Sequence, residues 1–187
     1  MSIKRLLAIC AATLTATFAA QAAVVTVSTT TPVAICDLCT VDSTINVTGH
    51  GTLTDLNLTI FSLTHTYDSD LAMWLISPTG TSVQLFNHRG GSGDNLINTV
   101  FDDQAATAIG SGAAPFTGSF RAEQLLSAFN GQDIFGTWTL RVADQVSQDR
   151  GSLNNWGLQL TTVPEPGSLA LVGLALVGLG VARRRKA

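Results

Sequence analysis

Aspartates are the residues of this chain most suited to chemistry. Between Ala23 and Val163 the sequence has twelve acidic residues, eleven of them aspartates, against four arginines and no lysine. The resulting net charge of −8 repels nucleic-acid phosphates and anionic lipid surfaces, which argues against both as partners. Carboxylate oxygens are instead the ligands that Ca²⁺ prefers in proteins. The composition therefore favours a divalent cation as the ionic partner.

Five of these aspartates fall in predicted loops or at the ends of predicted strands, where carboxylates can converge with backbone carbonyls. They are Asp70, Asp94, Asp102, Asp103 and Asp144. The sequence has no linear calcium loop of the D-x-D-x-D-G kind. Two interpretations stay open: the five bind calcium, or they are solvated residues that serve solubility and turn formation. No other cofactor is predicted.

Hydrolytic chemistry would require a nucleophile beside a general base. The three histidines, His50, His65 and His88, are candidate bases, and serines are frequent. However, the sequence has no G-x-S-x-G elbow or other nucleophile signature. A hydrogen-bonded structural role is the favoured interpretation of His65. The sequence thus predicts no catalytic residue.

Cys36 and Cys39 are separated by two residues and are flanked by strand and turn patterns. A redox-active pair would need a helix that begins at the first cysteine, and a zinc site would need two further soft ligands nearby. Neither is visible in the sequence. We therefore expect a local disulfide between Cys36 and Cys39, as in many exported proteins.

The N-terminus has the composition of a secretory signal. Lys4 and Arg5 precede an apolar run from Leu6 to Ala20, and Ala20-Gln21-Ala22 supplies the small residues of a signal peptidase site. This order of a positive start, a short apolar core and a small-residue exit is typical of a cleaved signal peptide. The sequence predicts a signal peptide over residues 1–22.

A second apolar run, Leu169 to Ala182, lies near the C-terminus. Four cations follow it: Arg183, Arg184, Arg185 and Lys186. The run is shorter than the roughly 20 residues of a comfortable span, but long basic side chains can snorkel at its end. Because basic flanks resist translocation, we expect a C-terminal membrane helix with a cytoplasmic anchor, and a body outside the inner membrane.

The region between the two ends reads as short strands separated by turns. Leu56, Leu58 and Ile60 alternate with polar neighbours, and the same period of two places Trp138 and Trp156 on inward faces. The run 71–77 is apolar on both faces, which suggests a strand buried inside a sandwich, although the side of Trp74 stays open.

Three connecting segments complete this interpretation of the fold. A loop is expected over 104–118, a helical turn over 121–129, and a hairpin loop over the glycine-rich 89–94. The fold predicted is a single all-β domain, an antiparallel β-sandwich (jelly-roll-like), flanked by the signal peptide and the C-terminal membrane helix.

Motifs near both ends of the predicted sandwich are similar to a known family. The segments 65–71 and 75–81, followed by 126–131, 136–144 and 151–156, carry the resemblance. They resemble the P domain (P/Homo B domain) that accompanies kexin-like proprotein convertases and bacterial subtilisin-like proteases. The resemblance covers 49–162 and implies a non-catalytic sandwich, with 23–48 as an N-terminal strand region that holds the cysteine pair.

The segment 163–187 resembles the PEP-CTERM sorting signal of Gram-negative bacteria. Its motif is Pro164-Glu165-Pro166, and the two prolines favour an exposed, extended segment. The resemblance implies that an exosortase cuts near this motif and passes the body from the inner membrane to the cell envelope or to an exopolysaccharide (biofilm) matrix.

Two functions follow as expectations from these resemblances. The first is an exported, non-catalytic binding or structural protein whose partner is a polysaccharide. The alternative is an accessory module that docks on a separately encoded subtilisin-like serine protease.

Overall fold

Residues 22–163 are described by the structure, which is a computed structural model. They form ten strands and three 3₁₀ turns. The strands are β1 (Ala23–Thr29), β2 (Val33–Ile35), β3 (Thr40–Val47), β4 (Thr52–His65), β5 (Leu71–Ile76), β6 (Ser82–Asn87), β7 (Leu96–Phe101), β8 (Phe116–Phe120), β9 (Gly136–Asp144) and β10 (Gly151–Val163). The turns are η1 (Asp68–Asp70), η2 (Ile109–Ser111) and η3 (Leu126–Phe129).

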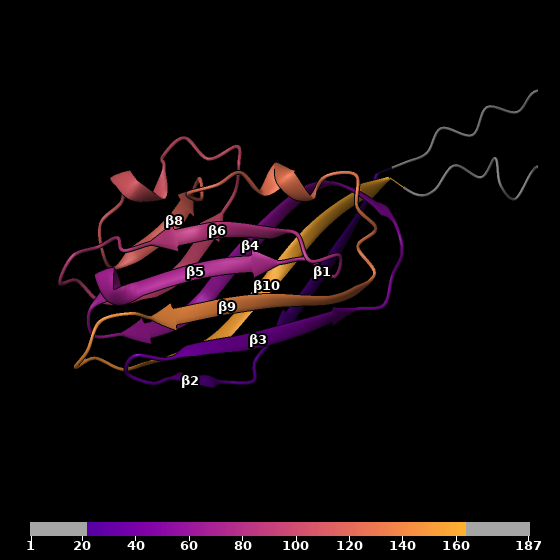
Figure 1. Cartoon of the computed structure of the whole chain (residues 1–187). Coiled ribbons are helices and arrows are strands. Elements are labelled where there is room, and N and C mark those ends of the chain that lie inside the picture. The colour runs from indigo at the N-terminus through magenta and orange to yellow at the C-terminus, as the bar shows by residue number, and fades with distance from the viewer. Residues whose placement is uncertain (1–21, 164–187) are drawn as a thin grey trace, which may run out of the picture. The chain divides into compact units, whose positions relative to one another are not determined.

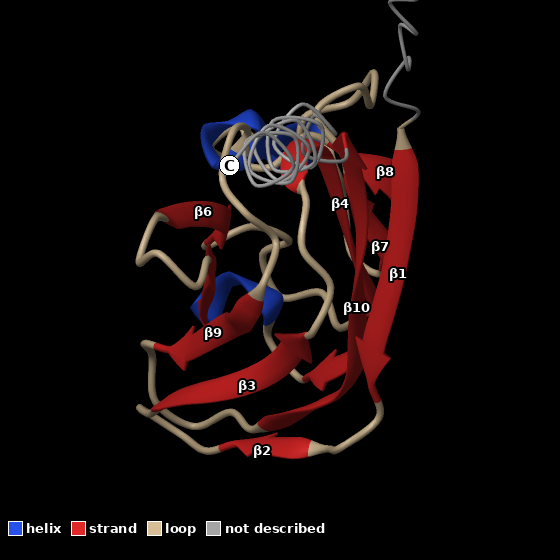
Figure 2. Ribbon diagram, turned by 90° about the vertical axis from the view of Figure 1, so that its right-hand side faces the viewer, coloured by secondary structure: helices blue, strands red, loops and turns tan. Residues whose placement is uncertain are grey.

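The strands form two sheets, which Figure 2 shows on opposite sides of one core. The larger sheet has the order β1-β10-β4-β7-β8, with β2 also paired to β10. The smaller sheet has the order β3-β9-β5-β6 and lies in front in Figure 1. The prediction of an all-β sandwich is therefore confirmed for the part of the chain that the structure describes.

The prediction of a purely antiparallel fold is wrong at one pair of strands. β7 and β8 are parallel, whereas the other pairs of named strands in residues 22–163 are antiparallel. A parallel neighbour requires a connection long enough to return to the starting end of the sheet. The chain between Phe101 and Phe116 provides that length and contains η2.

Period-two alternation is confirmed on the long strands. In β4, Leu56, Leu58 and Ile60 are buried, whereas Phe61 is 39% exposed on the other face. Trp138 on β9 and Trp156 on β10 are fully buried in the core. The Trp156 indole nitrogen donates a hydrogen bond to Ser43 Oγ of β3 at 2.9 Å, and so joins the two sheets.

β5 differs from the prediction of a strand buried on both faces. Leu71, Met73 and Leu75 face the core, but Trp74 and Ile76 are only half-buried on the outer face of the smaller sheet. No further layer covers that face among the described residues, since β5 belongs to a two-sheet fold. The apolar outer face of β5 is therefore a surface feature that needs its own explanation.

The glycine-rich segment 89–94 is not a hairpin loop. It lies between β6 of the smaller sheet and β7 of the larger one, so it crosses between sheets. Gly90 has a φ of +88°, and a Cβ there would lie 2.8 Å from the Phe116 ring. Glycine is suited to this position because the loop packs closely against the end of the core and leaves no space for a side chain.

The strands of residues 23–48 are joined to the strands of residues 49–162. β1 and β2 pair with β10, and β3 pairs with β9 along its whole length. The predicted boundaries of the domains stay predictions. Nearly all of the predicted signal peptide, and the predicted membrane helix, lie outside the described residues. Within 22–163 no helix is both long and apolar enough to cross a membrane.

Candidate functional site

One end of the sandwich gathers buried acidic side chains around His65. Asp70 in η1 and Asp144 at the end of β9 are 4% and 3% exposed. His65 Nε2 lies 3.3 Å from Asp144 Oδ2, and His65 Nδ1 lies 2.9 Å from the Tyr67 carbonyl. Burial raises the pKa of Asp70, and the nearby carboxylates of Asp149 and Asp144 raise it further.

The other three aspartates of the predicted calcium site lie elsewhere or are already bonded. Asp94 is exposed in the 88–95 loop, and Asp102 Oδ1 accepts a hydrogen bond from the Gln104 amide at 2.7 Å. Asp103 is bonded to the first residues of η3. Among residues 22–163 no group of three or more His, Cys, Asp or Glu side chains is placed to hold a metal ion.

The structure thus brings together only Asp70 and Asp144 of the five predicted ligands. Calcium binding stays a prediction. Thermal unfolding of the chain with calcium and with EDTA would check it, because an ion that binds only the folded state raises the melting temperature.

Asp103 has a structural role that the sequence did not reveal. Its Oδ1 accepts a hydrogen bond from the Leu126 amide and its Oδ2 one from the Ser127 amide, both at 2.8 Å. These amides open η3 and have no partner within that turn. The contact joins residues more than twenty positions apart, so no local sequence pattern predicts it.

We expect Asp103→Ala to lower the free energy of unfolding by about 1.5 kcal/mol, because two backbone amides lose a charged acceptor. Urea unfolding followed by circular dichroism measures this change. Asp94→Ala is the matched control, since Asp94 is exposed and its side chain accepts no hydrogen bond from residues 22–163. Equal stability of the two variants would contradict the role assigned to Asp103.

Asp68 is the most perturbed carboxyl of this end of the sandwich, and it was not among the predicted ligands. Its side chain is fully buried beneath the 88–95 loop. Oδ1 accepts a hydrogen bond from the Asn95 amide at 2.9 Å, whereas Oδ2 has no partner among the described residues. Burial raises the pKa of Asp68 to about 7. Asp68 is therefore protonated in the folded protein well above the pH at which a free aspartate ionises.

This raised pKa predicts a pH-dependent stability. The stabilisation from protonated Asp68 is fully present below about pH 4 and is lost as the pH rises through about 7. We expect Asp68→Asn, which cannot ionise, to gain roughly 2 kcal/mol relative to the native chain between pH 5 and pH 8. Urea unfolding at the two pH values measures the difference.

Asp94→Asn serves as the control for this comparison. Asp94 is exposed, and its charge is the smallest of the influences on the pKa of Asp68. Its variant should keep the pH dependence of the native chain. The measured quantity is the difference in stability between the native chain and Asp68→Asn. If this difference is the same at pH 5 and at pH 8, Asp68 is ionised at both pH values.

Each of the three histidines has a polar partner for its ring. His65 is occupied by Asp144 and the Tyr67 carbonyl, and His88 by Gln145 Oε1 and the Ser69 carbonyl. His50 contacts Asp133 at 2.7 Å and stacks on Phe135. None of the three has a hydroxyl or thiol hydrogen-bond partner among residues 22–163. A hydroxyl or thiol that is hydrogen-bonded to a histidine base is therefore not found in residues 22–163.

The cysteine pair forms a small exposed loop. Cys36 and Cys39 are joined by a disulfide, with their Cα atoms 5.5 Å apart. Leu38 between them has a φ of +54° and is 62% exposed. The Gln148 amide donates to Asp37 Oδ1 at 3.1 Å, so the loop is also bonded to the connection between β9 and β10.

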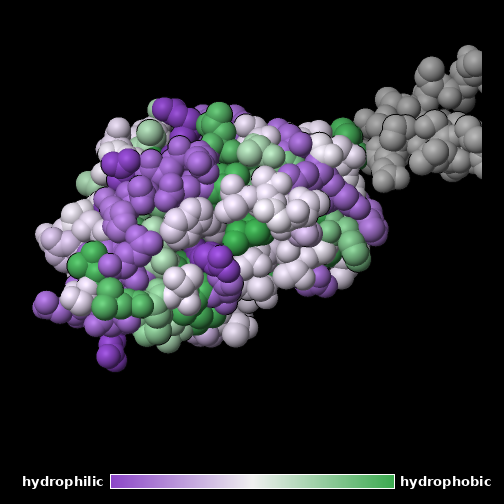
Figure 3. All heavy atoms as spheres, viewed as in Figure 1, coloured by the Kyte–Doolittle hydropathy of each residue, from purple (hydrophilic) through white to green (hydrophobic). Residues whose placement is uncertain are grey.

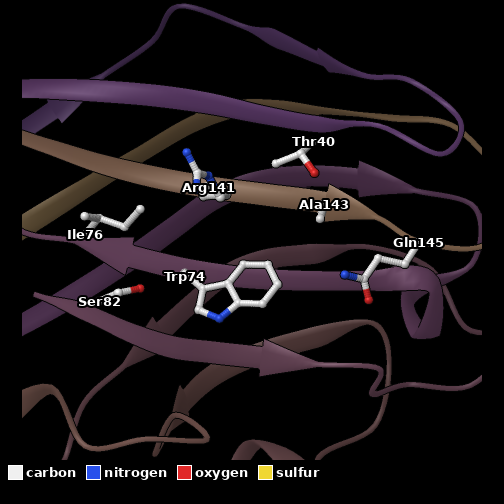
Figure 4. A pocket seen from close by; sticks show the side chains of 7 residues that line it. All are labelled: Thr40, Trp74, Ile76, Ser82, Arg141, Ala143 and Gln145. Carbon is white, nitrogen blue, oxygen red and sulfur yellow. The ribbon is translucent and has the colours of Figure 1, made fainter. Parts of the chain in front are cut away.

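A groove of about 330 Å³ crosses the outer face of the smaller sheet. Figure 4 shows its side chains, with the Trp74 indole between Ser82 on one side and Gln145 on the other, and with Arg141 alongside. Figure 3 views the same face and shows polar and apolar atoms interspersed, without one large apolar patch. The sequence contains a signal for this position of Trp74: if Leu75 faces the core, the period of two of a strand places Trp74 on the outer face.

The remaining predicted site residues lie outside the described residues. They are Pro164, Glu165, Pro166, Arg183, Arg184, Arg185 and Lys186.

Two family comparisons match adjoining parts of the chain. Residues 55–160 match the family described as proprotein convertase P-domain. Residues 162–186 match the PEP-CTERM protein-sorting motif. Together they cover the predicted sandwich from β4 onward and the predicted tail.

Individual relatives are much longer proteins. Leupeptin-inactivating enzyme 1 of Streptomyces exfoliatus is 32% identical over 95 residues, which are 51% of this chain and 16% of that enzyme. The serine protease of Aeromonas sobria, solved in complex with a chaperone, aligns with a TM-score of 0.49 and 20% identity over 76% of this chain and 28% of its own. The same protease solved alone aligns with a TM-score of 0.46 and 19% identity over 75% and 27%. The chain spans less than a third of each relative.

Proposed function

Because this chain belongs to the proprotein convertase P-domain family, we propose that it is an exported, non-catalytic binding module of the cell envelope. The sorting motif marks an exported protein. We further propose that an exosortase cuts near Pro164-Glu165-Pro166 and releases the sandwich to the envelope or to an extracellular polysaccharide matrix.

The position of the last strand is the observation that carries this proposal. β10 lies between β1 and β4, and its pairing continues to the end: Thr162 is opposite Ala23, and Val163 is opposite Thr52. The sorting motif begins at the next residue. A cut within 164–166 would therefore remove no residue of either sheet, so the released body keeps all of its strand pairing.

The ring partners of His65 support the non-catalytic part of the proposal. His65, the one histidine buried in the family's motif, has both nitrogens engaged by Asp144 and a backbone carbonyl. Neither ring nitrogen therefore faces a hydroxyl or thiol of the described residues that it could deprotonate. Its role in this sandwich is to join β4 to the end of β9.

The alternative function is an accessory module for a separately encoded subtilisin-like protease. It is favoured by the family's description, which names the proprotein convertases. Co-purification of such a protease with the processed chain, at a fixed ratio, would favour this alternative over a matrix function.

Processing of the tail tests the proposal directly. The full chain is expressed in a bacterium that contains an exosortase, and the C-terminal residue of the released protein is read by mass spectrometry. We expect release of a body that ends near residue 163, and retention of Pro164→Ala/Glu165→Ala/Pro166→Ala as full-length protein in the membrane fraction.

The matched control is Thr31→Ala/Pro32→Ala, which alters a proline-containing segment outside the sorting motif, and both of its residues are exposed. This variant should be released like the native chain. If the triple variant is released normally, or if the native chain stays full-length, sorting by the motif is refuted.

A further inference from the structure

The groove on the smaller sheet is built on one straight row of cross-strand neighbours. Asp42 on β3 is opposite Arg141 on β9, and Arg141 is opposite Trp74 on β5. Two bonds of 2.8 Å, from Arg141 Nε to Asp42 Oδ1 and from Nη2 to Oδ2, fix the guanidinium. This bidentate contact with Asp42 holds Arg141 beside the Trp74 indole, so the two sides of the groove that Arg141 and Trp74 form are pre-organised.

A small residue in the adjacent row contributes to the hollow. Ala143 on β9 is paired with Thr40 of β3, and both residues line the groove. The single methyl group of Ala143 leaves a space beside the Trp74 ring. Gln145, directly after β9, closes the far end of this space (Figure 4).

Several polar groups around the groove have no protein partner. Within residues 22–163 no hydrogen bond is made by Arg141 Nη1 or Gln145 Nε2, although other atoms of these two side chains are bonded. The hydroxyls of Thr40 and Ser82 likewise make none, and both residues are exposed. The groove thus surrounds one aromatic face with unused donors and acceptors on three sides.

We propose that this groove binds a neutral polysaccharide, with one sugar ring stacked on Trp74. The C–H face of a pyranose carries slight positive charge and is attracted to the negative face of an indole. Its equatorial hydroxyls then meet the unused groups of Arg141, Gln145, Thr40 and Ser82. A volume of about 330 Å³ suits a short segment of such a chain, since ligand sites begin near this size.

The charges favour a neutral polymer over an acidic one. Arg141 is the cation that lines the groove, and Asp42 neutralises it. Because the sandwich as a whole carries −8, an acidic polymer such as a polyuronate would find no unpaired cation in the groove and would be repelled. A protein segment is the less suitable occupant, because Trp74 and Ile76 are the only large apolar side chains that line the groove. This inference rests on the proposed function, whose ligand class it names.

Intrinsic fluorescence provides a specific readout. Of the three tryptophans, Trp138 and Trp156 are fully buried, so a ligand in the groove changes the emission of Trp74 alone. The purified full chain in detergent is titrated with the neutral hexasaccharides cellohexaose, laminarihexaose, isomaltohexaose and mannohexaose, and with alginate hexasaccharide. We expect saturable binding of at least one neutral hexasaccharide and none of alginate.

Calorimetry with the variants assigns the site, because it does not depend on the tryptophan signal. Trp74→Ala should weaken binding at least tenfold, and Gln145→Ala severalfold. Phe61→Ala is the control and should bind like the native chain, since Phe61 is an exposed aromatic on the other sheet. Circular dichroism confirms that each variant is folded.

The proposal is overturned if no neutral hexasaccharide binds, or if Trp74→Ala binds sugar as tightly as the native chain. It is also overturned if Trp74→Ala prevents capture of a protease and leaves sugar binding unchanged. Each of these outcomes is independent of tail processing. Normal release of a chain that binds no sugar would refute the ligand class alone, whereas failed release of a chain that binds sugar would refute the sorting proposal alone.

Discussion

Replacing Gly151 by alanine should lower the free energy of unfolding by about 3 kcal/mol or more. Gly151 begins β10, directly opposite His65 of β4 and Ile35 of β2. An added Cβ would overlap the Thr64 carbonyl and lie 2.7 Å from His65 Cδ2. Neither neighbour can move aside, because the carbonyl belongs to a paired strand and the imidazole is held by Asp144 and Tyr67.

Gly49→Ala provides the matched comparison for this substitution. A Cβ at Gly49 would meet nothing within 4 Å, and its φ lies outside the left-handed region. We expect this variant to be neutral or slightly more stable, since alanine restricts the unfolded chain. Urea unfolding of both variants, with the midpoint and the slope compared, measures the effect. Equal midpoints would show that β4 and β10 separate at Gly151 more easily than the structure indicates.

The long strands could be predicted from sequence because each has one face in the core. In β9 the inward residues are large and apolar at every second position, and in β10 the same alternation runs from Trp156 to Leu160, after an irregularity that follows Leu153. Such a pattern depends only on which face is buried, not on which strand is the neighbour. The strands that carry Trp138 and Trp156 were therefore recognisable from local information.

The shorter strands could not be predicted in this way. β7 was not identified, and β8 consists of Phe116-Thr117-Gly118-Ser119-Phe120, with a glycine at a φ of +100° in its centre. Its extended form depends on parallel pairing with β7, and the connection between them is a long loop. Pairing across such a loop is a property of the whole fold, so a sequence window contains little trace of it.

The candidate sites also depend on pairing between strands that are distant in sequence. Charge and residue type suggested calcium at five aspartates, but strand registers decide which of them meet, and only Asp70 and Asp144 do. The groove at Trp74 likewise depends on the two registers, β3 with β9 and β9 with β5, that align Asp42, Arg141 and Trp74. Residue types in the sequence indicate which side chains could form a site. Which of them lie next to one another depends on the pairing of strands that are distant in sequence.

Trp156→Ala should destabilise the chain by about 4 kcal/mol, because it removes the largest kind of core side chain and leaves a cavity. Trp156 is fully buried on β10, the strand that pairs with β1, β2 and β4. Its loss also leaves the buried Ser43 hydroxyl of the opposite sheet without its donor. Both effects act on the contact between the two sheets, and they add to each other.

Two further variants separate these effects. Trp156→Phe fills most of the space but lacks the indole nitrogen, so about 1.5 kcal/mol of the loss should persist. Trp74→Ala removes the same kind of side chain from the half-buried outer face and should cost about 1 kcal/mol. Urea unfolding followed by far-ultraviolet circular dichroism avoids the altered fluorescence. If Trp74→Ala proved as destabilising as Trp156→Ala, the outer face of β5 would be part of the core, and the groove assigned to it would not be a surface at all.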